Sequence, residues 1–389
     1  MSSASYSELK QRVSAVGEGA LPAANIIISG VAGSGKSTLI NAIFGEELAK
    51  TGIGKPVTDY IEKYEKENAP VRIWDTVGFE LKQSVTKNVI SDIKQLISYK
   101  SQNKQDLFDR IHSIWYCIQS TGTKLQPMEV QFIKELHGLG VPFIIVLTKC
   151  ISRENDDKFA IVINSMLKEN GVSDIPIVKV LAQDYEIDED MVVKHKGLDE
   201  LVNVTTSKLP DFILQSFIAA QKVEKVIKRK PAEDIVLRYC KYAKEQIIMK
   251  IPIINLFAAN SQLEKMFKEI GQMYNTYLSD DDIKKIYKNS IGEWSGKMWN
   301  LMIPFELPDM SKASQFFKKK VKDQPGFEGG NLNFDYWERS AKLITWAGYS
   351  WILSIEEFWD QLVEEKNEKI KEEIIDKMIT RLKHYMREK

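Results

Sequence analysis

The sequence has few cysteines and few histidines. Its 389 residues include three cysteines and four histidines, and neither type shows the spacing of a metal site. Two of the cysteines, Cys117 and Cys150, close apolar runs, where a thiol acts as a small hydrophobic side chain. This usage fits a reducing, cytoplasmic setting. No histidine accompanies a nucleophile motif, so metal, serine-triad and glycosidase chemistry find no support.

Long apolar runs and an excess of charge of one sign are also lacking. No run of about 18 apolar residues occurs and the first residues are polar, so we expect neither a membrane span nor a signal sequence. The 54 basic and 54 acidic residues balance, which leaves no overall field to attract nucleic acid. The short basic run KVIKRK (225–230) is typical of a solvated helix end. We expect no nucleic-acid partner, and contact with a membrane surface is not required.

The first half of the chain alternates short apolar runs with amphipathic ones. In the amphipathic runs, apolar residues recur three and four positions apart, which favours helices. The alternation is typical of an α/β fold, a mostly parallel sheet flanked by helices. The predicted strands are NIIIS (25–29), YIEKYE (60–65), VRIWD (71–75), SIWYCI (113–118), FIIVLT (143–148) and IPIVKVLA (175–182).

The second half of the chain carries only long helical patterns. We therefore predict a helical extension at 1–20, an α/β domain at 21–210 and an all-α domain at 211–389. The last pattern, 355–386, favours one long amphipathic helix with a polar gap near Asn367. A group of tryptophans in this half favours packing in a helical core over a membrane-interface belt or a protein-binding face. These are Trp299, Trp337, Trp346, Trp351 and Trp359.

The run GVAGSGKST (30–38) lies between a predicted strand and a predicted helix. It matches G-x-x-x-x-G-K-[ST], the phosphate-binding P-loop. Glycine lets the backbone N–H groups wrap phosphate oxygens, Lys36 reaches the terminal phosphates, and the Ser37 hydroxyl suits Mg²⁺. The predicted nucleotide-binding residues of this loop are Gly30, Gly33, Ser34, Gly35, Lys36, Ser37 and Thr38.

Two motifs between residues 51 and 78 fit a site that senses a γ-phosphate. In DTVG, Asp75 suits the Mg²⁺ shell and the Gly78 amide suits the γ-phosphate. Thr58, ahead of the strand at 60–65, suits the last Mg²⁺ position, with Thr51 as the alternative. We therefore predict Lys36, Thr58 and Gly78 as catalytic, and Ser37, Thr58 and Asp75 as metal ligands. Further on, Thr148 and Lys149 close a strand, and the stem of Lys149 suits a purine face.

These elements, in this order, resemble the Ras-like GTPases of the TrmE-Era-septin class. The resemblance covers about residues 20–210 and is closest to bacterial Era-like and immunity-related GTPase heads. Four segments resemble the sequence motifs of that class: SGKSTLINAIFG, DTVGFE, VPFIIVLTK and GLDELV. The resemblance implies GTP or GDP with Mg²⁺ as cofactors, and it implies that the Ala182 amide meets a guanine oxygen.

Two positions depart from the pattern of that class. Its members usually carry [NT]-K-x-D, whose Asp sets the preference for guanine, but Ile151 stands at that place. A carboxylate just beyond, at Glu154, Asp156 or Asp157, is a possible replacement if the loop folds back. Phe79 follows DTVG where a Ras-type site has a glutamine that positions water. Glu80 is a possible stand-in, although the sequence favours an ordinary charged surface residue there. We therefore expect slow hydrolysis that assembly accelerates.

The sequence favours a GTP-binding, slowly GTP-hydrolysing switch whose nucleotide state repositions the helical domain. The expected partner is a protein, or a second copy of the chain, that contacts the helical domain. Three alternatives stay open at this point. They are an ATPase, because of Ile151, a binding module without turnover, because of Phe79, and an assembling GTPase at a membrane surface, because of the tryptophans.

Overall fold

The computed structural model describes most of the chain. Its described residues are 21–45, 55–56, 58, 60–65, 70–76, 83–102, 107–188, 191–248, 256–276, 278–292, 312–321, 332–364 and 367–385. The extension predicted at 1–20 lies outside them. The chain divides into two compact units, Met1–Glu224 and Lys225–Lys389. This division falls later than the boundary that we expected at 210, because α8 (Asp211–Ala220) packs on the sheet of the first unit.

The first unit is built on a seven-stranded sheet in the order β2-β3-β4-β1-β5-β6-β7. Strands β4, β1, β5, β6 and β7 run parallel, and β2 and β3 are antiparallel additions at one edge. The predicted α/β fold is confirmed, and each predicted strand run holds a strand. The strands are β1 (Ala24–Ser29), β2 (Lys55–Pro56), β3 (Ile61–Glu65), β4 (Val71–Thr76), β5 (Ser113–Gln119), β6 (Phe143–Thr148) and β7 (Ile177–Lys179).

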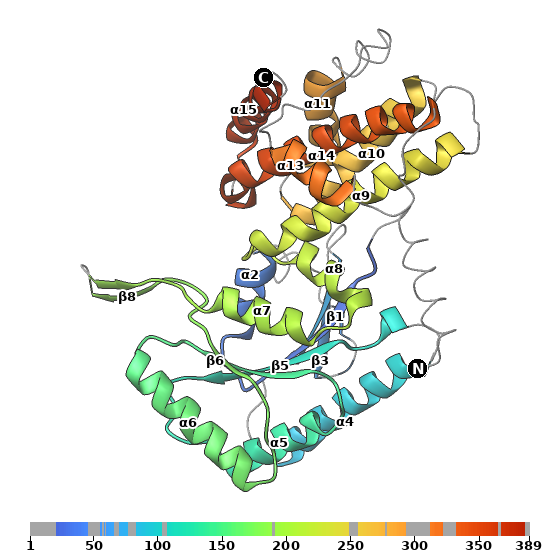
Figure 1. Ribbon diagram of the computed structural model, residues 1–389. Helices are drawn as coiled ribbons and strands as arrows, with labels where there is room; N and C mark the ends of the chain where they lie inside the picture. Colours follow the sequence, from blue (N-terminus) through green and yellow to red (C-terminus); the bar gives the residue numbers. More distant parts are fainter. Residues whose placement is uncertain are drawn as a thin grey trace. The chain divides into compact units, whose positions relative to one another are not determined.

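Helices cover both faces of this sheet, as Figure 1 shows. On one face lie α4 (Gln83–Ser101), α5 (Pro127–His137) and α6 (Arg153–Glu169). On the other lie α2 (Lys36–Phe44), α7 (Leu198–Lys208) and α8. Strands β1, β5 and β6 are buried along almost their whole length, which explains why their sequences are continuous apolar runs.

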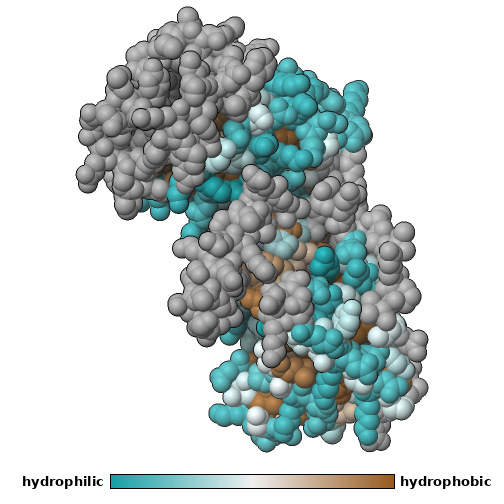
Figure 2. All heavy atoms as spheres, turned by 90° about the vertical axis from the view of Figure 1, so that its right-hand side faces the viewer, coloured by the Kyte–Doolittle hydropathy of each residue, from teal (hydrophilic) through white to brown (hydrophobic). Residues whose placement is uncertain are grey.

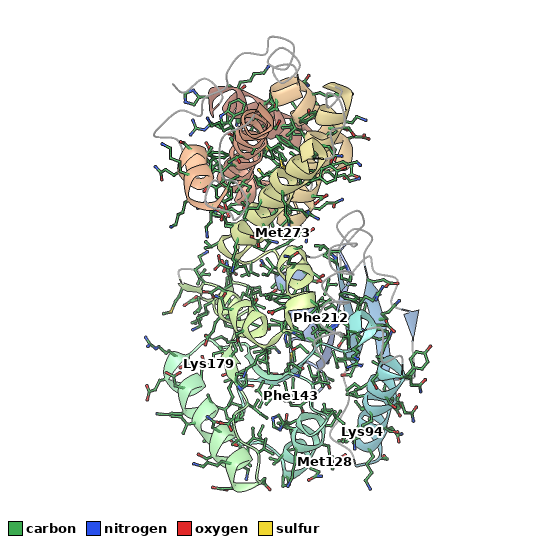
Figure 3. The ribbon with its side chains drawn as sticks, turned by 45° about the vertical axis from the view of Figure 1, so that its right-hand side comes forward. Lys94, Met128, Phe143, Lys179, Phe212 and Met273 are labelled. Carbon is green, nitrogen blue, oxygen red and sulfur yellow. The ribbon has the colours of Figure 1, made fainter. Side chains whose placement is uncertain are left out.

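Aromatic side chains fix α2 and α8 to the sheet. The Phe44 ring of α2 stacks on Trp115 of β5 with 6.0 Å between centroids, and Phe217 of α8 meets both rings edge-on. Phe212, labelled in Figure 3, lies edge-on to Phe108 and also contacts the His112 ring. Because these aromatic rings of α8 are buried against the sheet and α2, α8 belongs to the first unit although it follows the predicted boundary. On the face shown in Figure 2, most of the described surface is hydrophilic, with small apolar areas between.

The second unit is helical in its described part. Its most extensive contact among the described helices is that between α9 (Val226–Ile248) and α14 (Leu332–Glu364), with α10 (Leu256–Tyr274) packed on both. The remaining elements are α11 (Asp280–Tyr287), η3 (Lys288–Gly292), α13 (Lys312–Phe316), η4 (Phe317–Val321) and α15 (Glu368–Tyr385).

Tryptophans fill the core of this helical unit. Trp346, Trp351 and Trp359 are at most 4% exposed, which agrees with core packing. The Trp351 indole donates to the Phe267 carbonyl oxygen at 2.9 Å, and Trp359 donates to the Tyr274 carbonyl oxygen at 3.0 Å. Of the other tryptophans of that group, Trp299 lies outside the described residues and the side chain of Trp337 is not described. Among the described helices, none has the length and apolar character needed to cross a membrane.

The prediction of a single helix over 355–386 is wrong. The pattern divides between α14 and α15, at the polar gap that includes Asn367. The Asn367 side-chain oxygen accepts from the Lys369 amide at 3.0 Å, and its carbonyl oxygen accepts from Lys371 at 2.9 Å. Asn367 therefore caps α15, and α15 folds back onto α14 and α11.

The turn into α7 depends on a glycine that has no room for a side chain. Gly197 has φ 77°, and a Cβ there would lie 1.9 Å from the Lys179 carbonyl oxygen. Gly171 offers a matched control, because its φ is 76° and no atom lies within 4 Å of its Cβ position.

We expect Gly171→Ala to lower the free energy of unfolding by about 1–2 kcal/mol, the cost of a left-handed alanine. Gly197→Ala should cost more than about 3 kcal/mol, because it adds the clash with β7 to the same backbone cost. Urea unfolding of both variants measures the difference. Equal losses would show that the close approach at Gly197 does not constrain the turn.

Candidate functional site

The site begins at the loop between β1 and α2. Gly33 and Gly35 have φ values of 75° and 85°, the left-handed region that favours glycine. Gly35 is the N-cap of α2, and no side chain caps this helix end. The first backbone N–H groups of α2 therefore lack a side-chain acceptor, and the positive end of the helix dipole coincides with them. Such an end binds anions.

The loop lies directly against the ends of two neighbouring strands. A Cβ on Gly30 would lie 2.4 Å from the Cys117 carbonyl oxygen of β5, so only glycine fits. The Thr148 hydroxyl, at the end of β6, lies 2.7 Å from the Ser34 carbonyl oxygen. A Cβ built on Gly35 would lie 3.6 Å from the same threonine side chain, an ordinary contact distance. Thr148 therefore holds the loop in place by direct contact with its backbone.

Lys36 is held by the loop that precedes it. Its ammonium lies 3.0 Å from the Gly30 carbonyl oxygen and 3.4 Å from that of Val31. The residue is 7% exposed, so little of its charge meets water. These two contacts leave the ammonium a third N–H donor, which has the chemistry to meet an anion.

Asp75 lies one strand away, at the end of β4. It is 9% exposed, and its Oδ1 is buried without a hydrogen-bond partner. Burial raises the pKa of this carboxyl to about 7; Lys36 lowers it in part, and Glu62 on the adjacent β3 raises it. A buried carboxylate oxygen without a partner, next to a phosphate-binding loop, has the chemistry of a ligand for a hard cation.

The other predicted metal and catalytic residues are less completely described. Ser37, in the first turn of α2, is exposed. The Thr58 hydroxyl accepts from the Tyr60 amide at 3.1 Å, so it is turned into the local backbone. Gly78, Phe79, Glu80 and Thr51 lie outside the described residues.

The predicted base-binding residues end β6 and follow β7. Lys149 is exposed with φ 56°, a turn that lifts its side chain away from the buried strand. Ala182 is half-buried two residues after Val180, whose carbonyl oxygen accepts from the Cys150 amide at 3.1 Å. These contacts bring the Lys149 and Ala182 segments together at the same edge of the sheet as the loop.

The three carboxylates that might replace an aspartate at 151 differ in their surroundings. Glu154 is exposed and pairs with Lys158 at 2.6 Å, and Asp157 pairs with Lys179. Asp156 is 4% exposed, accepts from the Ser120 hydroxyl, and has its Oδ2 buried without a partner. Asp156 thus ties the start of α6 to Ser120, the residue that follows β5.

Comparison with known proteins places this geometry in a family. Residues 25–149 match the family model described as the 50S ribosome-binding GTPase. These matches support a P-loop GTPase domain of the TrmE-Era-septin class in the first unit. Its curated relatives include Septin-10 of Rattus norvegicus, 30% identical over 167 residues, which cover 38% of this chain and 37% of that protein.

Other relatives match a similar part of the GTPase domain. Septin-1 of Drosophila melanogaster is 26% identical over 203 residues, covering 46% of this chain and 54% of that protein. The chain thus spans about half or less of the length of these relatives. The crystal structure of a probable GTP-binding protein engB is 19% identical and covers 47% of this chain and 97% of its own, with a TM-score of 0.32, too low to carry a conclusion.

The sequence motifs did not reveal several residues of the GTPase domain that position the site residues through hydrogen bonds and strand pairing. The Thr76 hydroxyl donates to Ser29 at 3.1 Å, which joins the ends of β4 and β1. Glu62 faces Asp75 across the antiparallel pair of β3 and β4, and Ser120 holds Asp156. Ser120 and Asp156 lie 36 positions apart in sequence. Only strand register and burial bring such residues together, so no local pattern marks them.

The raised pKa of Asp75 predicts a pH dependence of stability in the absence of Mg²⁺. Between the ordinary pKa near 4 and the folded value of about 7, the folded chain binds more protons than the unfolded chain. Its free energy of unfolding therefore falls as pH rises through that interval. Asp75→Asn removes this loss, so we expect the variant to gain roughly 4 kcal/mol over the wild type between pH 4 and pH 8, which is about 1.4 kcal/mol for each unit of the pKa difference.

Thermal unfolding of both proteins in EDTA across that interval measures the gain. The control is Asp157→Asn, because Lys179 lowers the pKa of Asp157. That variant should be less stable than the wild type by an amount that stays nearly constant from about pH 5 to pH 8, because the titration of Asp157 is complete below that interval. A constant difference between Asp75→Asn and the wild type at all pH values would contradict the burial of an uncompensated carboxyl.

Proposed function

We propose that this chain is a GTP-binding and slowly GTP-hydrolysing molecular switch whose nucleotide state repositions its helical domain. The observation that carries the proposal is the position of Lys36, which is bonded to the carbonyl oxygens of Gly30 and Val31. The lysine side chain is already ordered in the fold, so binding a terminal phosphate would cost it little further conformational entropy.

The described residues fit a nucleotide with Mg²⁺. The buried Oδ1 of Asp75 and the buried Ser34 hydroxyl both lack partners, and the N-terminus of α2 has no side-chain cap. Amides of Gly33 to Lys36 would hold phosphate oxygens, and Ser37, Thr58 and Asp75 would hold the cation, directly or through water. When bound, Mg²⁺ neutralises charge on the phosphate oxygens.

The residues of the chain divide the work between binding and sensing. Lys36 supplies a fixed positive charge where negative charge develops during phosphoryl transfer. Thr58 now accepts from the Tyr60 amide, and for Thr58 to turn toward a cation it must give up that bond. A γ-phosphate would thereby order the segment around Thr58, and the Gly78 amide would report the same group.

The base end of the site favours GTP through backbone and packing contacts. The Ala182 amide would meet the guanine oxygen, and the Lys149 stem would lie along the purine face. Asp156 and Ser120 would hold the segment of Lys149 in position. The apolar Ile151 lacks the acceptor that rejects adenine, so ATP is the second candidate nucleotide.

The proposed partner is a protein, or a second copy of the chain, that contacts the helical unit and accelerates hydrolysis. The residue after Gly78 is Phe79, which cannot orient water by hydrogen bonding, so slow intrinsic turnover is expected.

Binding of labelled GTP and ATP with Mg²⁺, followed by phosphate release, tests this function. Lys36→Ala should weaken GTP binding by roughly 10- to 100-fold, the loss of a charge-assisted contact. Lys158→Ala is the matched control, because Lys158 pairs only with exposed Glu154 in the described structure, and it should bind as the wild type does. Phosphate release by the wild type should be slow.

Two results would count against the proposal. ATP binding as tight as GTP binding would refute the guanine preference and favour the ATPase. Binding of neither nucleotide, or equal binding by Lys36→Ala and the wild type, would refute the role of the loop.

A further inference from the structure

Two carboxylates face each other across strands β3 and β4. Glu62 of β3 is the register partner of Asp75, near the end of β4. Directly opposed residues of an antiparallel pair carry their side chains on the same face, with Cβ atoms about 4.5–5.5 Å apart. Like charges at such positions repel each other, so two acidic residues are an unfavourable choice here. A local rule that a fold breaks in this way calls for a compensating gain.

No basic side chain of the described residues neutralises Glu62 through an ion pair. Another glutamate of the same strand, Glu65, shows the ordinary arrangement, because it pairs with Lys63 at 2.7 Å and with Arg72 at 3.2 Å. The hydrogen bond of the Glu62 side chain comes instead from a neutral group, the Tyr64 hydroxyl. The negative charge of Glu62 is therefore held in place without a cationic side chain.

The Tyr64 hydroxyl fixes the carboxylate of Glu62. Tyr64 lies two positions further along β3, on the same face of the sheet, and donates to Glu62 Oε2 at 2.6 Å. Burial, and then the bond to Glu62, raise the pKa of Tyr64, so its hydroxyl stays a donor. Because Glu62 is half-buried and held, it does not escape the repulsion by turning into solvent. A carboxylate accepts several hydrogen bonds, so this one leaves acceptor capacity unused.

Asp75 provides an independent sign of a missing ligand. It is 9% exposed, and its Oδ1 is buried without a hydrogen-bond partner among the described residues. A buried carboxylate oxygen without a partner is costly. Here it lies beside a second carboxylate that has no ion pair. A divalent cation relieves both defects at once, and oxygen sites bind such cations more tightly as their negative charge increases.

We propose that Glu62 is a second carboxylate of the cation site to which Asp75 belongs. This inference rests on the proposed function, which assigns Asp75 to Mg²⁺. Because Mg²⁺ keeps several of its waters in most protein sites, Glu62 acts on the hydrated cation as a positioning residue and not as a direct ligand. The two carboxylates repel each other in the metal-free chain, and the cation turns that repulsion into attraction.

One substitution should therefore have opposite effects without and with the cation. Glu62→Gln keeps an oxygen that accepts from Tyr64 and removes only the charge. In EDTA at pH 8, above the Asp75 pKa of about 7, it should raise the thermal midpoint of the full-length, nucleotide-free chain by about 1–3 °C. In a Mg²⁺ titration to about 10 mM, followed by the same midpoint, its dissociation constant should be about tenfold higher than that of the wild type.

Two further variants separate the charge of Glu62 from other causes. Glu65→Gln is the matched control, because Glu65 lies on the same strand but pairs with Lys63 and Arg72. It should gain no stability in EDTA and should bind Mg²⁺ within about twofold of the wild type. Tyr64→Phe removes the hydrogen bond and leaves both carboxylates, so its Mg²⁺ dissociation constant should stay within about threefold of the wild type.

Four results would overturn the inference. They are a lower midpoint of Glu62→Gln in EDTA, an unchanged Mg²⁺ dissociation constant in that variant, an equal weakening by Tyr64→Phe, and a wild type that does not respond to Mg²⁺. None of these measurements uses a nucleotide. A wild type that responds to Mg²⁺ as expected but binds no GTP would count against the proposed function and leave the role of Glu62 standing.

Discussion

The close approach of one loop to the ends of β5 and β6 governs the geometry of the site. Gly30 lies so near the Cys117 carbonyl oxygen that any Cβ would clash, and Thr148 contacts the Ser34 backbone. Because the loop is held in this way, its carbonyl oxygens fix the Lys36 ammonium. The N-terminus of α2 directly follows the same loop. Asp75 reaches the site from β4, on the other side of β1. A phosphate site follows from the packing of strands.

The electrostatics of the site follow from the same packing. Asp75 is buried because the strands on either side of β4 shield it, and its raised pKa records the absence of a partner for Oδ1. Lys36 compensates that charge in part. A nucleotide with its cation would supply opposite charges at both places, so the metal-free GTPase domain carries a local cost that binding would relieve. The buried carboxyl of Asp75 therefore lowers the stability of the metal-free domain.

The sequence predicted the strands and the loop well, because both depend on local patterns. Short runs rich in apolar residues predicted the six main strands, and the P-loop pattern predicted Lys36 and Gly35 with their surroundings. It did not predict β2, which is two residues long, or the hairpin of β8 (Tyr185–Asp188) and β9 (Met191–Val193), whose strands are short and largely exposed. It also joined α14 and α15, because the cap at Asn367 is a matter of side-chain geometry rather than periodicity.

The supporting residues of the site were beyond sequence reasoning for a different physical reason. Ser120 and Asp156 meet only when β5 and α6 are packed, and Glu62 approaches Asp75 only through the register of β3 and β4. Three carboxylates near Ile151 were equivalent in sequence. In the structure, ion pairs with Lys158 and Lys179 separate Glu154 and Asp157 from the buried Asp156.

Amide hydrogen exchange with and without GTP and Mg²⁺ tests the central claim most directly, namely that the loop between β1 and α2 holds the phosphates of a nucleotide. The account predicts slower exchange in peptides that cover Gly33 to Ser37, together with those that cover Lys149 and Ala182. Unchanged exchange in the loop peptides at saturating nucleotide, or slower exchange confined to the helical unit, would contradict it.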